Sequence, residues 1–195
     1  LESGTLHHLF AVYQCRKKLR RIRGTLELHL NERHIKFSKN NQPLEIEIRK
    51  QKEANELIEE FMILANICAA ETLEKQLKTC VYRVHEPPST DKLADLALLA
   101  DGMDIDLPEE PNFTPKQLNQ LLEKAPTDAD KELLQNAILR CQSRANYATE
   151  NSGHYGLGLQ RYAHFTSPIR RYSDLLTHRA LIDACNLGAD GINNI

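Results

Sequence analysis

The segment EANELIEEFMILANICAAETLEKQLK, residues 53–78, constrains the fold more than any other part of this chain. It is rich in Ala, Leu and Glu and contains neither Gly nor Pro, so nothing in it interrupts a helix. Its middle, FMILANICAA, is apolar all around a helix, which predicts burial on most sides. The rest of the chain must therefore supply several elements that cover it.

A second helix and a set of short strands are predicted before this segment. Residues 5–22 carry apolar side chains at helical spacing, and Gly24 ends that helix. Apolar and polar residues then alternate strictly at 26–30, 35–37 and 44–48. Such alternation is typical of half-buried strands, so we expect three short strands in an antiparallel meander.

The second half of the chain is predicted to be mostly helical. A short strand at 81–84 is followed by helices that begin after Ser89, Thr114 and Thr127, which are good N-cap residues. A last helix is predicted from Pro168 to about Cys185, with Ser167 as its N-cap. These elements predict one α+β domain, with short antiparallel strands followed by a mostly helical half and no linker.

Charge and cysteine content exclude several classes of protein. The net charge of −2 gives no overall basic field, so any anion-binding function must come from local clusters. No apolar window is long enough to span a membrane, so we expect no membrane partner. The five cysteines are scattered without a CxxC pair, which favours reduced thiols and a cytoplasmic location over a zinc site or a disulfide framework.

One such cluster is RKKLRRIR, residues 16–23, with six cations in eight positions. These cations suit non-specific contacts with a nucleic-acid backbone. A solvated face of the first helix explains the same pattern equally well. The sequence leaves both interpretations open.

The densest group of polar side chains is YAHFTSPIRRYSD, residues 162–174. With Ser167 at the N-cap, Arg170 and Arg171 lie in the first helical turn, beside free backbone N–H groups and the positive end of the helix dipole. This combination is an anion site, and arginine adds a two-pronged fork for phosphate oxygens. The alternative is a surface ion pair between Arg170 and Asp174, four residues apart.

Four blocks of the sequence together resemble the ribonuclease II / ribonuclease R family, whose catalytic unit is the RNB domain. HYGLGLQRYAHFTSPIRRYSDLLTHR at 154–179 is similar to the family signature, and LIEEFMILANICAA at 57–70 is similar to its glutamate-bearing helix. YRVHEPPS at 82–89 and RGTLEL at 23–28 resemble two of its short strands. The resemblance covers nearly the whole chain and is nearest to the bacterial ribonuclease R members.

The resemblance implies a processive 3′-to-5′ exoribonuclease. Members of the family hydrolyse single-stranded RNA with Mg²⁺ and release nucleoside 5′-monophosphates. The chemistry is two-metal phosphoryl transfer, in which carboxylates hold the ions and cations meet the developing charge. It also implies that the complete protein is a monomer.

The resemblance assigns roles to charged residues of this chain. Arg170 matches the arginine that contacts phosphate near the scissile bond, and Arg171 a structural or flanking phosphate contact. Glu60 matches the glutamate that contacts the sugar of the terminal nucleotide, with Glu59 as the fallback. A carboxylate there accepts a hydrogen bond from the 2′-hydroxyl, which helps to separate RNA from DNA.

The same resemblance points to aromatic and hydroxyl side chains. Tyr155, Tyr162 and His164 carry aromatic faces interleaved with arginine, which suits stacked bases. Ser167 belongs to the same predicted RNA-binding set. Leu28 occupies the position where some members place a phenylalanine that clamps bases, and a leucine lacks the aromatic face needed for stacking.

Two parts of the family pattern have no counterpart here. The aspartate-rich motif that holds the metal lies upstream of everything seen in this sequence, and the flanking OB-type RNA-binding domains are also missing. Residues 1–195 are therefore predicted to be a partial RNB domain with no metal ligands of its own, inactive alone. A non-catalytic RNA-binding remnant and a purely structural helical module are the alternatives.

Overall fold

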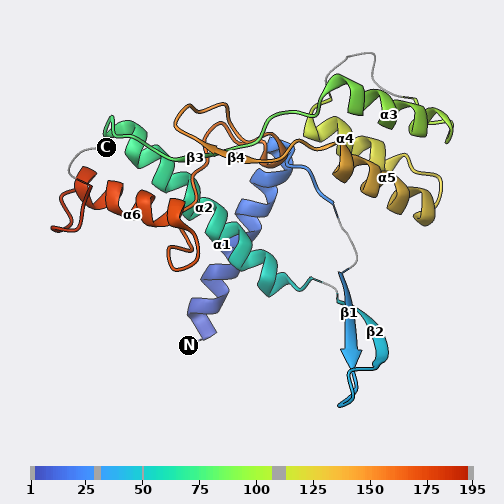
Figure 1. Ribbon diagram of the computed structural model, residues 1–195, viewed down its shortest axis with the longest axis horizontal. Helices are drawn as coiled ribbons and strands as arrows, with labels where there is room; N and C mark the ends of the chain where they lie inside the picture. Colours follow the sequence, from blue (N-terminus) through green and yellow to red (C-terminus); the bar gives the residue numbers. More distant parts are fainter. Residues whose placement is uncertain (1–2, 29–31, 50, 107–112, 193–195) are drawn as a thin grey trace.

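The computed structural model describes residues 3–28, 32–49, 51–106 and 113–192. Helices α1 (Ser3–Arg23) and α2 (Glu53–Lys75) cross in the centre of the molecule (Figure 1). Both predicted helices are confirmed, and α2 ends at Lys75 instead of residue 78. Among the helices of the described part, none is long and apolar enough to cross a membrane.

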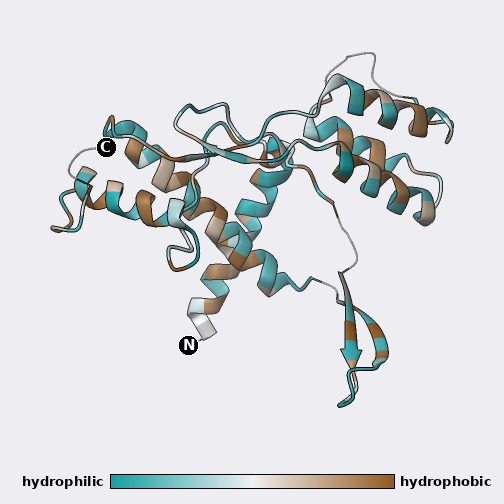
Figure 2. Ribbon diagram, viewed as in Figure 1, coloured by the Kyte–Doolittle hydropathy of each residue, from teal (hydrophilic) through white to brown (hydrophobic). Residues whose placement is uncertain are grey.

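A two-stranded hairpin separates the two helices in the sequence. β1 (Glu32–Phe37) and β2 (Pro43–Arg49) are antiparallel, with Ile35 opposite Ile46. The hairpin projects from the body of the molecule (Figure 1), and hydrophobic positions alternate with hydrophilic ones along it (Figure 2). Two of the three predicted strands are thus confirmed.

The predicted strand at 26–30 is wrong for its described residues, because 25–28 have no regular secondary structure. Residues 29 and 30 lie outside the described ranges. The backbone hydrogen bonds of the segment go elsewhere. The Leu26 N–H donates to the Gly156 carbonyl (2.9 Å), and the Glu27 N–H donates to Oδ1 of Asn119 (2.9 Å). The alternating pattern correctly predicted that residues 26–28 are half-buried, but these residues do not pair with a neighbouring strand.

One side of the long helix α2 is more deeply buried than the other. Leu57, Ile63 and Leu73 are buried, whereas Ile58 and Met62 are 57% and 41% exposed. The predicted burial of its middle, residues 61–70, on most sides is confirmed, since only Met62 and Cys68 in this stretch are exposed. The helix is contacted by α1 and by α6 (Tyr172–Ala184), and these two cover only part of its surface.

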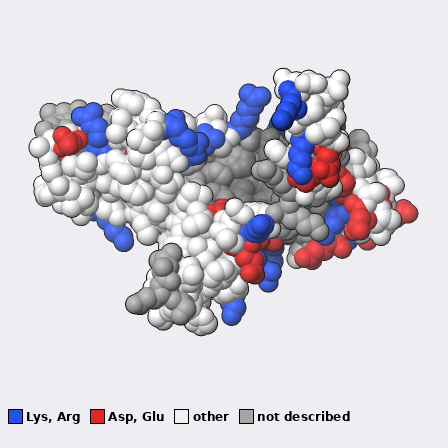
Figure 3. All heavy atoms as spheres, turned by 90° about the horizontal axis from the view of Figure 1, so that it is seen from below, with Lys and Arg blue, Asp and Glu red and all other residues white. Residues whose placement is uncertain are grey.

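Helices α3 (Thr90–Asp101), α4 (Pro115–Glu123) and α5 (Asp128–Cys141) form one end of the molecule around their own apolar core (Figure 1). Acidic side chains gather toward this end in the view from below (Figure 3). Two predicted caps are confirmed, because the Thr114 and Thr127 hydroxyls accept backbone N–H groups of α4 and α5. Ser89 lies at the N-cap of α3, but its side chain makes no capping hydrogen bond. All five cysteines are free.

A small sheet links this end to α2 and α6. β3 (Tyr82–Val84) pairs with β4 (Asn146–Ala148), and on its other side the Arg83 N–H donates to the Tyr162 carbonyl (2.8 Å). Tyr82 bridges Ala163 on that side. Together with the end of α2, these strands enclose a second core that contains Leu73, Tyr82, Val84 and Ala163. The α+β class and the helical second half are confirmed.

The start of the last helix differs from the prediction. α6 begins at Tyr172 with Arg171 as its N-cap, and Pro168–Arg170 form a separate turn. Arg171 has extended backbone angles (φ −130°, ψ 120°), which a helix cannot include. The Ser167 carbonyl accepts the N–H groups of Arg170 (3.3 Å) and Arg171 (3.1 Å), which closes the turn.

Candidate functional site

The turn before α6 is built around the buried carboxylate of Asp174. This carboxylate accepts hydrogen bonds from the Ser167 backbone N–H (2.8 Å) and from Nε and Nη2 of Arg171 (2.9 and 2.8 Å). Burial alone raises the pKa of Asp174, but these hydrogen bonds and the charge of Arg171 outweigh burial and hold the pKa below its ordinary value. The ionised carboxylate therefore fixes both ends of the turn.

Arg170 lies on this turn with an exposed side chain. Within the described ranges its guanidinium makes no hydrogen bond and no ion pair with the protein. The predicted ion pair between Arg170 and Asp174 is wrong, because Arg171 occupies the carboxylate (2.8 Å). Placement of Arg170 and Arg171 inside the first helical turn is also wrong. Arg170 is instead presented to solvent just before the helix.

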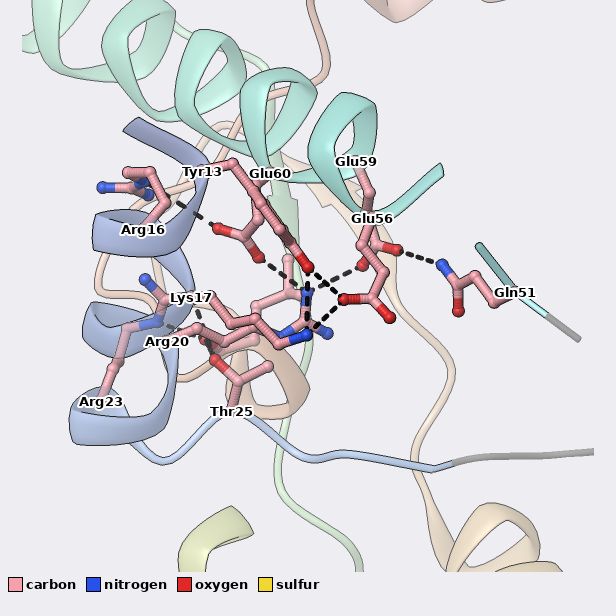
Figure 4. A network of polar contacts seen from close by, with 11 residues as sticks. Tyr13, Arg16, Lys17, Arg20, Arg23, Thr25, Gln51, Glu56, Glu59 and Glu60 are labelled. Atoms are coloured by element: carbon pink, nitrogen blue, oxygen red, sulfur yellow. Dashed lines mark hydrogen bonds and ion pairs between the residues drawn. The ribbon is translucent and has the colours of Figure 1, made fainter. Parts of the chain in front are cut away.

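Glu60 is buried in α2 (2% exposed) although it is charged. Nη1 of Arg20 donates to its Oε1 (2.8 Å) and also to Oε1 of Glu59 (2.8 Å), while Nε of Arg16 lies 3.9 Å from its Oε2 (Figure 4). That second oxygen, Oε2, is buried without a hydrogen-bond partner. A buried acceptor left unpaired is costly, which makes it a candidate for a ligand hydroxyl.

A cavity of about 630 Å³ adjoins this carboxylate. Glu60, Leu28 and His154 are among the side chains that line it. Burial, with the nearby charges of His85 and Arg83, lowers the pKa of His154 to about 4, so its ring is neutral near pH 7. The cavity thus brings together two sequence-predicted positions, Glu60 and Leu28.

Most cations of the basic cluster at 16–23 contact α2 or the turn at 155–157. Nζ of Lys17 pairs with Glu56 (2.6 Å), and Nε of Arg23 donates to the Leu157 carbonyl (2.8 Å). The solvated-face interpretation is therefore wrong for these side chains, and the contact with a nucleic-acid backbone stays a prediction. Four of the six cations in the cluster make contacts within the protein: Arg16, Lys17, Arg20 and Arg23. Lys18 and Arg21 are exposed.

The three predicted aromatic RNA contacts lie in different surroundings. The Tyr155 hydroxyl donates to the Phe113 carbonyl, and the buried Tyr162 hydroxyl accepts from Nδ2 of Asn66 (2.8 Å). His164 is half-buried, with its Nδ1 2.8 Å from the Tyr147 hydroxyl. Their RNA-binding roles stay predictions, and the tyrosine hydroxyls are already engaged by the protein.

Sequence reasoning missed two residues that position the site. Asn66 holds the Tyr162 hydroxyl and also accepts the Phe165 N–H (2.9 Å), so it connects α2 to the segment before α6. Arg20 holds Glu60. A signal existed for each: Asn66 is a lone amide in an apolar helix, and Arg16, Arg20 and Arg23 recur at helical spacing on one face.

No group of three or more His, Cys, Asp or Glu side chains in the described residues could hold a metal ion. The side chains in the described part of the chain therefore do not fit a metal site. The Asp174 and Glu60 carboxylates are engaged by arginines instead.

An exposed arginine on a rigid turn, a buried carboxylate beside a cavity and aromatic residues between them are features of a phosphate- and sugar-binding surface. Residues 2–186 match the family described as the RNB domain, and the chain belongs to that family. RNB proteins are ribonucleases that generally use a divalent metal ion.

Named relatives narrow the comparison to ribonuclease R. The chain is 41% identical to Ribonuclease R of Vibrio cholerae over 176 aligned residues. The aligned region covers 90% of this chain and 21% of that protein. It is 29% identical to Mycoplasma genitalium RNase R in complex with ribose-methylated single-stranded RNA, with a TM-score of 0.85 over 96% of this chain and 30% of that one. The chain thus spans under a third of the length of these relatives.

A further structural neighbour is described as a pseudonuclease. Yeast Ssd1 has 25% sequence identity and a TM-score of 0.59, over 72% of this chain and 18% of that one.

Proposed function

We propose that this chain is part of the catalytic domain of a processive 3′-to-5′ exoribonuclease that hydrolyses single-stranded RNA to nucleoside 5′-monophosphates. The observation that carries the proposal is the position of Arg170. Its guanidinium is exposed on a turn that Asp174 fixes, and no carboxylate in the described residues neutralises it. A fixed, unpaired fork of this kind is suited to a phosphate.

In this proposal Arg170 contacts the phosphate near the scissile bond and meets the charge that develops there. Ser167 and Arg171 shape the turn, since Arg171 already donates two hydrogen bonds to Asp174. Arg171 is thus a positioning residue whose remaining charge flanks the phosphate path. The turn would hold Arg170 in place before the substrate arrives, which lowers the entropy lost on binding.

Glu60 contacts the sugar of the terminal nucleotide. Its Oε2 is buried beside the cavity without a hydrogen-bond partner, although Nε of Arg16 lies 3.9 Å away, so a 2′-hydroxyl would supply the missing hydrogen bond. DNA lacks that hydroxyl and leaves the oxygen unsatisfied. Tyr155, Tyr162 and His164 support the same surface from the interior, and Leu28 offers the cavity an apolar wall.

We further propose Mg²⁺ as the metal of the complete protein, with its ligands outside the described residues. Bound there, it would supply Lewis-acid stabilisation of the reacting phosphate. The complete protein is proposed to act as a cytoplasmic monomer with single-stranded RNA as its partner.

The test substitutes Arg170 in the protein expressed from its own gene. Arg170→Ala is expected to slow hydrolysis of 5′-labelled single-stranded RNA by roughly 10²- to 10³-fold, the usual cost of removing one charge-stabilising donor. Affinity for RNA should fall by much less. Arg140→Ala, an exposed arginine on α5, is the matched control. Unchanged turnover in Arg170→Ala would remove this residue from the mechanism.

The second candidate is a non-catalytic RNA-binding protein of the same family, which the likeness to the pseudonuclease favours. The same labelled RNA separates the two. Stepwise shortening of the RNA by the complete protein with Mg²⁺ supports the nuclease. Tight, salt-sensitive binding without any shortening supports the second candidate, and a loss of both would leave only the structural-module hypothesis.

A further inference from the structure

We propose that Tyr147, held by Arg83 and His164, is a stacking platform for one base of single-stranded RNA. This inference rests on the proposed function, because it needs RNA at the Arg170 turn. It adds a binding residue from β4, a strand to which neither the sequence analysis nor the proposed function gives an RNA contact.

The platform lies on the face of the small sheet that points away from the second core. Side chains of a strand alternate between its two faces. Tyr82 and Val84 are buried in the core, so Arg83 between them faces the other way. Arg83 and Tyr147 are directly opposite each other on β3 and β4, and side chains of such a pair share one face.

The Tyr147 ring is held by two neighbouring side chains and remains partly exposed. Cζ of Arg83 lies 4.8 Å from the ring centroid, which is a cation–π contact. The hydroxyl lies 2.8 Å from Nδ1 of His164, whose ring packs edge-on against the tyrosine. The residue nevertheless remains 44% exposed. A ring that is already immobilised loses little freedom when a base stacks on its exposed surface.

The charges around the platform favour a polyanion. The pKa of His164 falls to about 4 through burial first and then through the charges of Arg171, Arg83 and Arg170, while Asp174 opposes the shift. Three guanidinium groups are therefore close enough to act on His164, and one of them is the unpaired Arg170. A base on Tyr147 would place its backbone among these cations, as single-strand-binding surfaces do. β4 itself, Asn146–Ala148, contains no acidic residue.

A structural role is the competing explanation. An Arg–Tyr pair across two strands stabilises a sheet whether or not RNA binds. That role predicts lower stability for variants but equal RNA affinity for the folded fraction. Stacking predicts that the RNA affinity of the folded protein falls in a variant without an aromatic ring at position 147. It predicts that a variant that keeps an aromatic ring retains its affinity.

The first experiment measures RNA binding by fluorescence anisotropy in EDTA, so that no metal-dependent hydrolysis occurs. The protein is the full chain from its own gene, and the probe is a labelled oligouridylate. Tyr147→Leu is expected to weaken binding at least fivefold, and up to roughly 100-fold, which is the range for one lost stacking contact. Tyr147→Phe should stay within about threefold, since stacking needs the ring and not the hydroxyl. Phe37→Leu, an exposed aromatic on β1, is the matched control.

A second readout is direct and does not depend on a destabilised variant. This chain contains no tryptophan, so Tyr147→Trp adds one fluorophore at the platform while keeping an aromatic ring. After subtraction of the wild-type signal, RNA should quench the added emission, and an abasic oligonucleotide of equal length should not. Phe37→Trp should show no quenching.

The outcomes are distinct. Equal affinity of Tyr147→Leu and wild type, or unquenched Tyr147→Trp emission at saturating RNA, overturns the platform and leaves the proposed function intact. If the wild-type protein binds no RNA at low salt, the proposed function itself fails. Quenching by both the base-containing and the abasic oligonucleotide would place phosphate, not a base, at Tyr147 and would also overturn the platform.

Discussion

Arg171 and Asp174 form a two-pronged ion pair across the start of α6, with Nε–Oδ1 at 2.9 Å and Nη2–Oδ2 at 2.8 Å. Two neighbouring arginines in the sequence are thereby given different tasks. Arg171 pairs with the buried Asp174 carboxylate, whereas the Arg170 guanidinium has no partner among the described residues. The sequence spacing pointed to the other pairing, because a helix from residue 168 would put Arg170 and Asp174 on one face.

The ion pair predicts a large stability cost for Asp174→Asn. The amide cannot accept both prongs of Arg171 and the Ser167 N–H, so the half-buried Arg171 loses its charged partner and a buried position loses hydrogen bonds. We expect the free energy of unfolding in urea to fall by about 3–5 kcal/mol. Asp183→Asn is the control on the same helix, because its pair with Lys78 is solvent-exposed and should cost less than about 1 kcal/mol. Equal losses in both variants would contradict this account.

Glu60 predicts discrimination between RNA and DNA. Glu60→Gln removes the charge that a 2′-hydroxyl would meet, so RNA affinity should fall by about tenfold while DNA affinity hardly changes. The measurement is the ratio of dissociation constants for one sequence as RNA and as DNA. Glu59→Gln, the neighbouring and more exposed carboxylate, serves as the control. If only Glu59→Gln changes the ratio, the sugar contact belongs to Glu59.

Two half-buried histidines, His154 and His164, predict that acid lowers the stability of the protein. Burial, followed by nearby positive charges, lowers the pKa of His154 and of His164 to about 4 from an ordinary value of 6.5. Below pH 6.5 the unfolded chain binds protons that the folded chain refuses. Stability should therefore fall as the pH drops from about 6.5 to about 4.

Urea unfolding at several pH values measures this slope. His154→Gln should reduce the dependence of the unfolding free energy on pH, since one of the two histidines with a lowered pKa is removed. His34→Gln removes an exposed ring on β1 and should leave the slope unchanged. A slope that is the same in all three proteins would exclude these histidines as its source.

Salt dependence tests whether Arg170 meets a phosphate. Each phosphate neutralised in single-stranded nucleic acid contributes about 0.7 to the slope of log K against log salt. Arg170→Ala should therefore reduce the slope by about that amount in EDTA. Arg140→Ala should retain the full slope. A loss of affinity in Arg170→Ala with an unaltered slope would indicate a contact other than a phosphate.

Local sequence signals predicted most of the elements. Thr114 and Thr127 cap α4 and α5 as their residue types require, because capping depends on residues within one turn. The region at 26–28 failed because alternation reports half-burial, and half-burial does not require a neighbouring strand. Its donors find Gly156 and Asn119, which are far away in the sequence.

The sequence alone predicted which residues are candidates for binding and catalysis: an arginine pair after a proline, a glutamate on an apolar helix and aromatic residues between them in the sequence. It predicted these because residue types and short spacings are local properties. Only the tertiary structure decided how the charges pair. Arg20 turns to Glu60 from another helix (2.8 Å), and Arg171 rather than Arg170 takes Asp174. Pairing depends on distances between distant segments, so only the folded chain shows that, of Arg170 and Arg171, it is Arg170 whose guanidinium has no partner among the described residues.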